Sequence, residues 1–306
     1  MSPSKPLSPR AAHALLHVTV FTWGFTAILG RLISISAVPL VWYRLVVVLP
    51  VMALALRWKG KPFGTAPKTM RAFWGIGVLV ALHWLCFYGC IKYAGVAVAV
   101  LCLSTITFFT ALIEPLVFKR GIVVAELLIG LAAVGGVSLL VRFETNATPM
   151  GLALGLGSAL FSAGFGTLNG RWSQGEPAER VTLHELSSGL VVTSLAFLAW
   201  DFVPPWALSG ADVGWLLLLG VVCTVFPWLA SLRILETLSP YTIALTVTLE
   251  PVYSLVLAYV LFPGEEQLTW RFYTGALGLL SLVLLNGWLK RPKPPGTAFV
   301  RAAEPR

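Results

Sequence analysis

The chain of 306 residues has very few charged side chains. Only 11% of its residues are Asp, Glu, Lys or Arg, against 57% that are hydrophobic, whereas soluble domains carry roughly 25% charged residues. A water-soluble globular fold is therefore excluded. Intrinsic disorder is excluded as well, because disordered segments are poor in the apolar residues that dominate this sequence.

Cysteine is scarce, and its placement suits neither cross-links nor a metal. Cys86, Cys90, Cys102 and Cys223 all lie within apolar runs, whereas a disulfide framework or a zinc knuckle would place pairs in loops. His83, Cys86 and Cys90 have metal-like spacing, but no second set of ligands accompanies them. We therefore expect no metal site.

The sequence also lacks the motifs that carry catalysis. It contains no GxSxG, no HExxH, no paired intramembrane aspartates and no glycine-rich loop that would cradle phosphates. An intramembrane enzyme would have to use His83 or Glu250 without an evident partner. We expect no enzyme, no catalytic residues, no cofactor and no direct coupling to ATP.

Long apolar segments are what the sequence does contain. A membrane-spanning helix needs roughly 20 apolar residues, and in lipid such runs must be helical because every backbone polar group needs an internal partner. The pattern predicts an all-α polytopic membrane protein with ten transmembrane helices, at about 11–31, 38–57, 73–91, 94–118, 122–141, 149–170, 182–200, 212–232, 238–262 and 270–289.

The net charge of +9 is explained by membrane topology. With the N-terminus inside, 17 of the 22 Lys and Arg residues fall on the inner side and four on the outer side, as the positive-inside rule requires. Both termini are therefore predicted to be cytoplasmic, and no nucleic-acid partner is expected. The basic residues before the first apolar run resemble a signal peptide, but that run is too long and we interpret it as a retained span.

An internal repeat divides the chain. Residues 21–31 and 161–171 share Phe, Gly, Phe, Gly and Arg at five of eleven positions, and residues 83–85 align with 227–229 at an offset of 144. Each half holds five spans, an odd number, so the second copy must be inverted relative to the first. Inverted repeats of this kind are typical of secondary transporters, whose sites lie near the midplane.

The repeat sets the expected domain organisation. We predict an N-terminal cytoplasmic tail, a first five-helix repeat, a second, inverted five-helix repeat and a basic cytoplasmic tail. Their expected ranges are 1–10, 11–146, 147–290 and 291–306. Laying the fourth span on the ninth with an offset of 143 puts Thr107 opposite Glu250.

Several short motifs resemble the drug/metabolite transporter superfamily, and within it the ten-helix EamA-type family. The resemblance covers about residues 11–290 and implies the 5+5 inverted fold and a role in metabolite efflux, without indicating the substrate. It rests on the repeat and on Trp23-Gly24-Phe25, Arg44, Lys92-Tyr93-Ala94-Gly95-Val96, Lys119-Arg120 and Leu249-Glu250-Pro251.

Glu250 is the most informative ionisable residue. It lies about 18 Å from either end of its expected span, where a charge costs roughly 2.5–3.5 kcal/mol. Pro251 should break the helix and free a carbonyl near Val247, and Pro115 is a second candidate break in the fourth span. Glu250 either binds a substrate amine or carries a coupling proton, or it hydrogen-bonds between helices as a structural residue.

Arg44 and His83 are further candidates for the cavity. Arg44, about five residues into the second span, either meets a substrate carboxylate or extends to the outer surface. His83 lies near the centre of the third span, either as a satisfied interior residue or as part of the cavity. Trp23 and Trp84 would suit apolar or aromatic cargo, although aromatic residues are also common in membrane helices.

Polar residues recur at helical spacing on the fourth and ninth spans, which places hydroxyl groups on one face of each helix. Such residues either line a cavity or donate to carbonyl groups and hold helices together. The candidates are Ser104 and Thr107 on the fourth span, Thr246 and Tyr253 on the ninth, and Asn169 on the sixth.

The sequence thus predicts a secondary active transporter that exports a small amino-acid-like or amphipathic organic metabolite by alternating access. A passive, channel-like uniporter and a proton-coupled multidrug exporter remain alternatives. The expected partners are the small-molecule substrate and membrane lipid, and the sequence leaves a homodimer open. Very short loops favour a multi-pass protein of a prokaryotic inner membrane.

Overall fold

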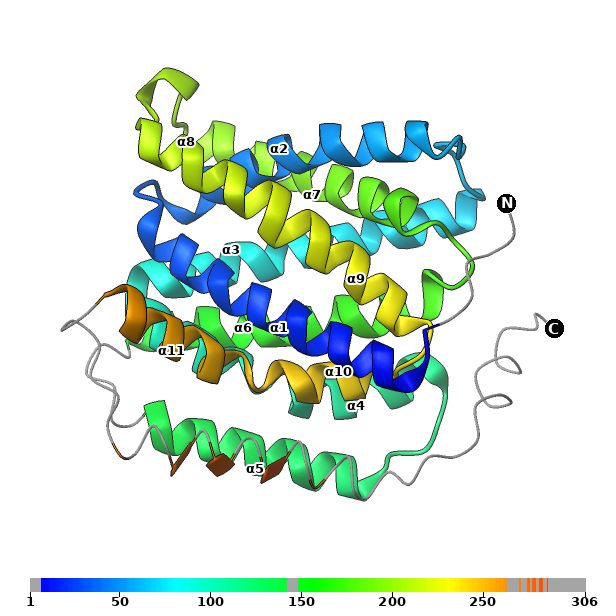
Figure 1. The fold of residues 1–306 in the computed structure, drawn as a ribbon, viewed down its shortest axis with the longest axis vertical. Coiled ribbons are helices and arrows are strands. Elements are labelled where there is room, and N and C mark those ends of the chain that lie inside the picture. Colours follow the sequence, from blue (N-terminus) through cyan, green and yellow to red (C-terminus); the bar gives the residue numbers. More distant parts are fainter. Residues whose placement is uncertain are drawn as a thin grey trace.

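The computed structural model describes residues 7–141 and 148–262, together with Trp270, Thr274, Gly275, Leu277, Gly278, Ser281, Leu282 and Leu285. The predicted tenth span at 270–289 and both tails therefore lie largely outside the described residues. Within the described residues the fold is entirely helical, and Figure 1 shows the long helices lying side by side with similar axis directions.

The helices follow the predicted order of apolar segments. The elements are α1 (Pro9–Leu32), α2 (Ala37–Trp58), α3 (Pro67–Leu103), α4 (Ile106–Phe118), α5 (Val124–Val141), α6 (Pro149–Trp172), α7 (Ala178–Trp200), η1 (Pro205–Ala207), α8 (Gly210–Leu217), η2 (Leu218–Val225), α9 (Phe226–Leu235), α10 (Pro240–Val247) and α11 (Glu250–Leu261).

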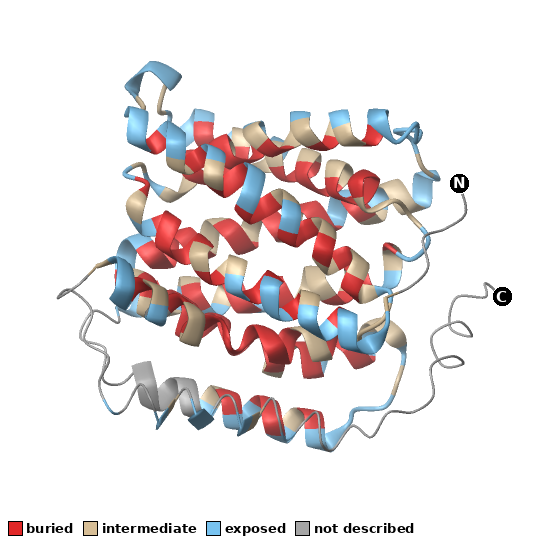
Figure 2. Cartoon of the chain, in the orientation of Figure 1, coloured by how far each residue is buried: buried red, intermediate tan, exposed pale blue. Residues whose placement is uncertain are grey.

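Seven of the described helical segments are long and apolar enough to cross a membrane. Five are single helices, and two are composite: 210–235 joins α8, the π-helix η2 and α9, and 240–261 joins α10 and α11. Figure 2 shows buried residues concentrated on the inward faces of the bundle. The chain is thus a multi-pass membrane protein.

The third and fourth spans meet differently from the prediction. α3 continues to Leu103 across a kink at Gly95, whose φ of 86° is a backbone conformation that only glycine adopts readily. The fourth span is therefore split between the last turns of α3 and α4. Apolar periodicity carries no information about such a kink, so the predicted gap at 92–93 was placed too early.

The fourth and ninth spans are both interrupted at equivalent positions of the two repeats. The hydroxyl of Thr105 donates to the carbonyl of Cys102 at 2.7 Å, and that of Thr248 donates to Leu245 at 2.6 Å, an offset of 143 in both cases. α4 begins just after Thr105, and α11 begins at Glu250. The two repeats thus share a broken helix near the centre of the bundle.

Proline accounts for only one of these breaks. Pro251 lies in the first turn of α11, where its missing N–H costs no hydrogen bond. Pro115, in contrast, lies inside α4, which is continuous from Ile106 to Phe118. The predicted break at Pro115 is not observed, because the interruption of this span occurs about ten residues earlier.

The corresponding helices α1 and α6 run in opposite directions. Gly30 near the end of α1 packs on Ile91, and Gly151 at the start of α6 packs on Ala94, one turn further along α3 and just before its kink at Gly95. At the other end, Thr237 donates to the carbonyl of Leu7, which precedes α1. Their opposite directions fit an inverted repeat. We call the end with the α1–α2 and α7–α8 loops the outer end, and the opposite end the inner end, following the charge bias.

Candidate functional site

A cavity of about 100 Å³ lies between the two halves, beside the interrupted helices. Its walls come from α1, α2, α3 and α4 of the first half and from α6, α9, α10 and α11 of the second. Leu103 and Ile106 flank one helix break in this wall, and Val247 and Glu250 flank the other. The cavity has room for several water molecules or a small organic group.

Six of the ten predicted cavity residues line this space, and four do not. Ser104, Thr107 and Thr246 are buried and donate to the carbonyls of Val100, Ala244 and Thr242 respectively. Tyr253 packs its ring edge-on against Phe21 instead. The polar stripes thus hold backbone groups together. The six that line the cavity are Trp23, Arg44, His83, Trp84, Asn169 and Glu250.

Arg44 is buried, with 3% of its surface exposed, and its guanidinium is held by three contacts. Its Nε donates to the hydroxyl of Thr224 at 2.7 Å and its Nη1 to Tyr88 at 3.0 Å. The guanidinium carbon also lies 3.9 Å from the centroid of a Trp84 ring, a cation–π geometry. Arg44 therefore faces the cavity instead of extending to the surface, and it forms no ion pair within the described residues.

The π-helix η2 positions the partner of Arg44. The hydroxyl of Thr224 donates to the carbonyl of Leu219, five residues earlier, at 2.6 Å, so its lone pairs are directed toward the guanidinium. Short π-helical segments occur frequently at functional sites. Nothing in the apolar sequence of 218–225 distinguishes this segment from an ordinary α-helix.

Glu250 occupies the first turn of α11, because the interruption at residues 248–249 starts a new helix there. The partial positive charge of a helix N-terminus favours a carboxylate at this position. The side chain is 3% exposed and lines the cavity. Within the described part of the chain, no salt bridge reaches it.

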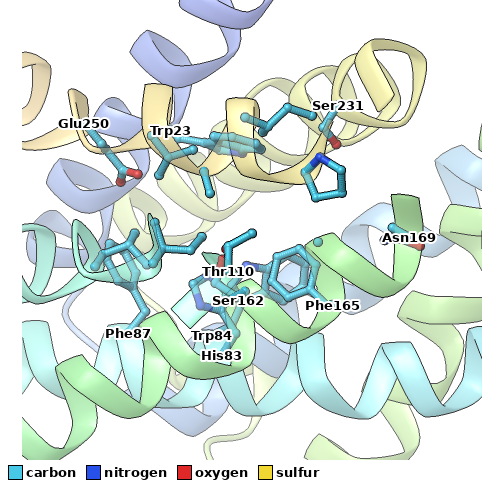
Figure 3. Close-up of a pocket in the computed structure, with 18 of the residues that line it drawn as sticks. Trp23, His83, Trp84, Phe87, Thr110, Ser162, Phe165, Asn169, Ser231 and Glu250 are labelled. Atoms are coloured by element: carbon cyan, nitrogen blue, oxygen red, sulfur yellow. The ribbon is translucent and has the colours of Figure 1, made fainter. Parts of the chain in front are cut away.

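Aromatic rings form much of the remaining wall (Figure 3). Trp84 and Trp228, which are equivalent in the two repeats, meet with ring centroids 5.4 Å apart, and Phe165 stacks on Trp228 at 5.5 Å. Nδ1 of His83 lies 2.9 Å from both the hydroxyl and the carbonyl oxygen of Ser158. His83 is thus an interior histidine with hydrogen-bond partners, and its ring also contacts Phe165.

The sequence argument missed Glu185. Glu185 is fully buried on α7, and Asn169 Nδ2 lies 3.3 Å from its Oε2. Gly189 and Thr193 follow at four-residue intervals on the same buried face. This small-residue spacing was the available signal that the face packs inward.

A charged cluster joins the two halves at the inner end. Glu114 accepts from the backbone N–H of Tyr241 at 2.8 Å, and Arg120 donates to both Glu114 and Glu126. Burial lowers the pKa of Arg120, but the hydrogen bond to Glu126 and the charge of Glu114 outweigh it, so that this pKa is raised. The cluster fastens the first turn of α10 to α4 and α5.

The described residues contain no group of three or more His, Cys, Asp or Glu side chains arranged to hold a metal ion. His83, Cys86 and Cys90 therefore do not form a metal-ligand cluster there.

Comparison with known proteins gives consistent results at the level of fold. The EamA-like transporter family matches the chain twice, over residues 10–142 and 149–288. No curated protein matches the sequence. Among solved structures, one described only as "Crystal structure of protein" covers 93% of this chain and 100% of its own, with a TM-score of 0.74 and 15% sequence identity.

Proposed function

Because the chain belongs to the EamA-like transporter family, we propose that it is a secondary active transporter that exports a small amino-acid-like metabolite. The observation that carries this proposal is that Arg44 and Glu250 line the same cavity. The two side chains have opposite formal charges, both are buried, and neither forms an ion pair within the described residues. Buried charges are costly unless they are paired.

A zwitterion would satisfy both groups. The guanidinium of Arg44 is suited to a carboxylate, because its N–H donors match two carboxylate oxygens, and Glu250 is suited to an ammonium group. The aromatic wall around Trp84 and Trp228 would receive an apolar side chain. An α-amino acid combines these three features in a small molecule.

Alternating access would follow from the repeat. At the inner end, Glu114 of the first half accepts from the backbone N–H of Tyr241 of the second; at the outer end, Asp212 accepts from both the backbone N–H and the hydroxyl of Ser34 at 2.7 Å. If the two inverted halves exchange conformations, one closure opens while the other forms. We further propose ten spans, both termini in the cytoplasm, and a prokaryotic inner membrane.

Counterflow in proteoliposomes tests the carrier mechanism. Vesicles loaded with unlabelled norleucine should transiently accumulate labelled norleucine, and the rate should saturate with concentration. A channel-like protein would give flux without saturation or counterflow. Empty vesicles provide the control, and absence of counterflow for norleucine would contradict the proposed substrate class.

Cysteine labelling tests the orientation. Lys61 and Trp206 are both exposed, in the α2–α3 loop and in η1 respectively. A membrane-impermeant maleimide should label the Trp206→Cys variant in intact cells, and the Lys61→Cys variant only in inverted vesicles. The wild type is the background control, since Cys90, Cys102 and Cys223 are buried and Cys86 is partly buried. The reverse pattern would contradict the proposed topology.

A further inference from the structure

Four buried side chains at or near the cavity have polar atoms without a hydrogen-bond partner. They are Oγ1 of Thr167, Oδ1 of Asn169, Oε1 of Glu185 and Nε1 of Trp228, and these residues are 0–4% exposed. Asn169 and Trp228 line the cavity, whereas Glu185 is not part of its lining and is hydrogen-bonded to Asn169. Unsatisfied polar atoms at such burial are rare and call for an explanation.

The side chains of Asn169, Glu185 and Trp228 belong to one cluster. Asn169 Nδ2 joins Asn169 to Oε2 of Glu185, and the indole of Trp228 lies beside the same carboxyl group without forming a hydrogen bond of normal geometry. No charged side chain among the described residues forms a salt bridge with Glu185. The cluster therefore presents a carboxyl group and an amide oxygen, without a counterion, beside the cavity wall.

A primary ammonium group complements this arrangement. Entering between Asn169 and Trp228, it would donate to Oδ1 of Asn169 and Oε1 of Glu185. The ring faces of Phe165 and Trp228 are stacked at the cavity wall, and aromatic faces attract a cation further. One ligand group would thus satisfy both acceptor oxygens.

The cluster lies far from Glu250. Figure 3 shows Asn169 and Glu250 at opposite ends of the cavity. The neighbouring residue Gly170 packs on Pro240 at the start of α10, whereas Glu250 begins α11. A ligand that reaches both groups therefore needs two separate amino groups.

Formal charge favours the same ligand class. Arg44 contributes one positive charge, while Glu250 and Glu185 together contribute two negative charges. A zwitterion would leave this set with one negative charge, whereas an amino acid with a second, cationic amino group would balance it. Electrostatic complementarity of this kind selects among ligands of the same shape.

We propose that Asn169, Glu185 and Trp228 form a second binding site, for the side-chain ammonium group of a basic amino acid. This inference rests on the proposed function, and it identifies amino acids that carry a terminal amine as the preferred substrates. Arg44 and Glu250 hold the zwitterionic end, and the Asn169 cluster holds the other end.

Lysine and norleucine test this site, because they differ only in the terminal amine. In counterflow with the wild type, lysine should have a KM about tenfold lower than norleucine, the value of one charge-assisted hydrogen bond. The Glu185→Gln variant should lose this preference while exchanging norleucine at a rate within about twofold of the wild type. Asn169→Ala should weaken the preference in the same direction.

Norleucine exchange by the variants serves as the folding control. Equal KM values for lysine and norleucine in the wild type would overturn the second site and leave the proposed function intact. A lysine preference that persists in both Glu185→Gln and Asn169→Ala would overturn it as well. Exchange of neither compound by the wild type would contradict the proposed function itself, and the second site with it.

Discussion

Replacing Gly77 with alanine is expected to lower the melting temperature by about 5–10 °C or to abolish the folded protein, the largest effect on stability that we predict. A Cβ at this position would lie 1.9 Å from the carbonyl oxygen and 2.9 Å from the Cα of Glu185. These are backbone atoms of α7, so no side-chain rotation relieves the overlap. α3 and α7 would have to separate.

Separation of α3 and α7 would disturb more than one contact. The hydroxyl of Ser188 donates to the carbonyl of Trp74 across the same crossing at 2.6 Å, and Glu185 itself belongs to the polar cluster with Asn169. Overpacking in a close-packed interior typically costs about 1–3 kcal/mol. At a rigid helix crossing, the cost of the added methyl group should lie at or above the upper limit of that range.

Gly75 is the matched control for Gly77. It lies two residues earlier on α3, and a Cβ there would meet nothing within 4 Å. Gly75→Ala should therefore leave stability unchanged or raise it slightly, because alanine favours the helix. Melting curves of the purified proteins in detergent compare the two variants. A Gly77→Ala protein that melts at the wild-type temperature would contradict the close crossing described here.

The sequence predicted which residues correspond to each other at the centre of the bundle, because an internal repeat places equivalent residues of the two halves around one axis. The alignment of residues 83–85 with 227–229 paired Trp84 with Trp228, and the structure brings these two rings into contact. The alignment of the fourth and ninth spans put Thr107 opposite Glu250, and the structure begins a new helix at Ile106 and at Glu250, although the break predicted at Pro115 is absent. Such equivalent residues can be identified from the sequence alone, without knowing which other side chains pack against them.

Contacts between particular neighbours could not be predicted in the same way. Helical spacing places Thr107 and Thr246 on one face of their helices, but it does not say whether that face meets a carbonyl group or a cavity, and both residues donate to carbonyls. Glu185 was not singled out because the sequence places it near one end of its span without showing that its face of α7 is directed inward. The π-helical turn that orients Thr224 has no sequence pattern of its own.

Replacing Glu250 with glutamine is expected to lower kcat/KM for counterflow of norleucine and of lysine by about 100-fold. Removal of one partner of a buried charged pair costs about 2–5 kcal/mol, which corresponds to roughly 30- to 4,000-fold. Glutamine keeps the size of the side chain, so the first turn of α11 and the shape of the cavity should be preserved. Both substrates should suffer equally, because both present their α-amino group to Glu250.

This common loss separates Glu250 from Glu185, whose glutamine variant should affect lysine alone. Glu236→Gln is the matched control: this carboxylate pairs with Arg233 at 3.3 Å, is about one third exposed, and should contribute little when removed. If Glu250 instead serves only as a proton carrier, the variant would retain norleucine counterflow and lose only accumulation driven by a pH gradient. Full activity in both assays would remove Glu250 from the mechanism and leave Arg44 as the remaining charged anchor in the cavity wall.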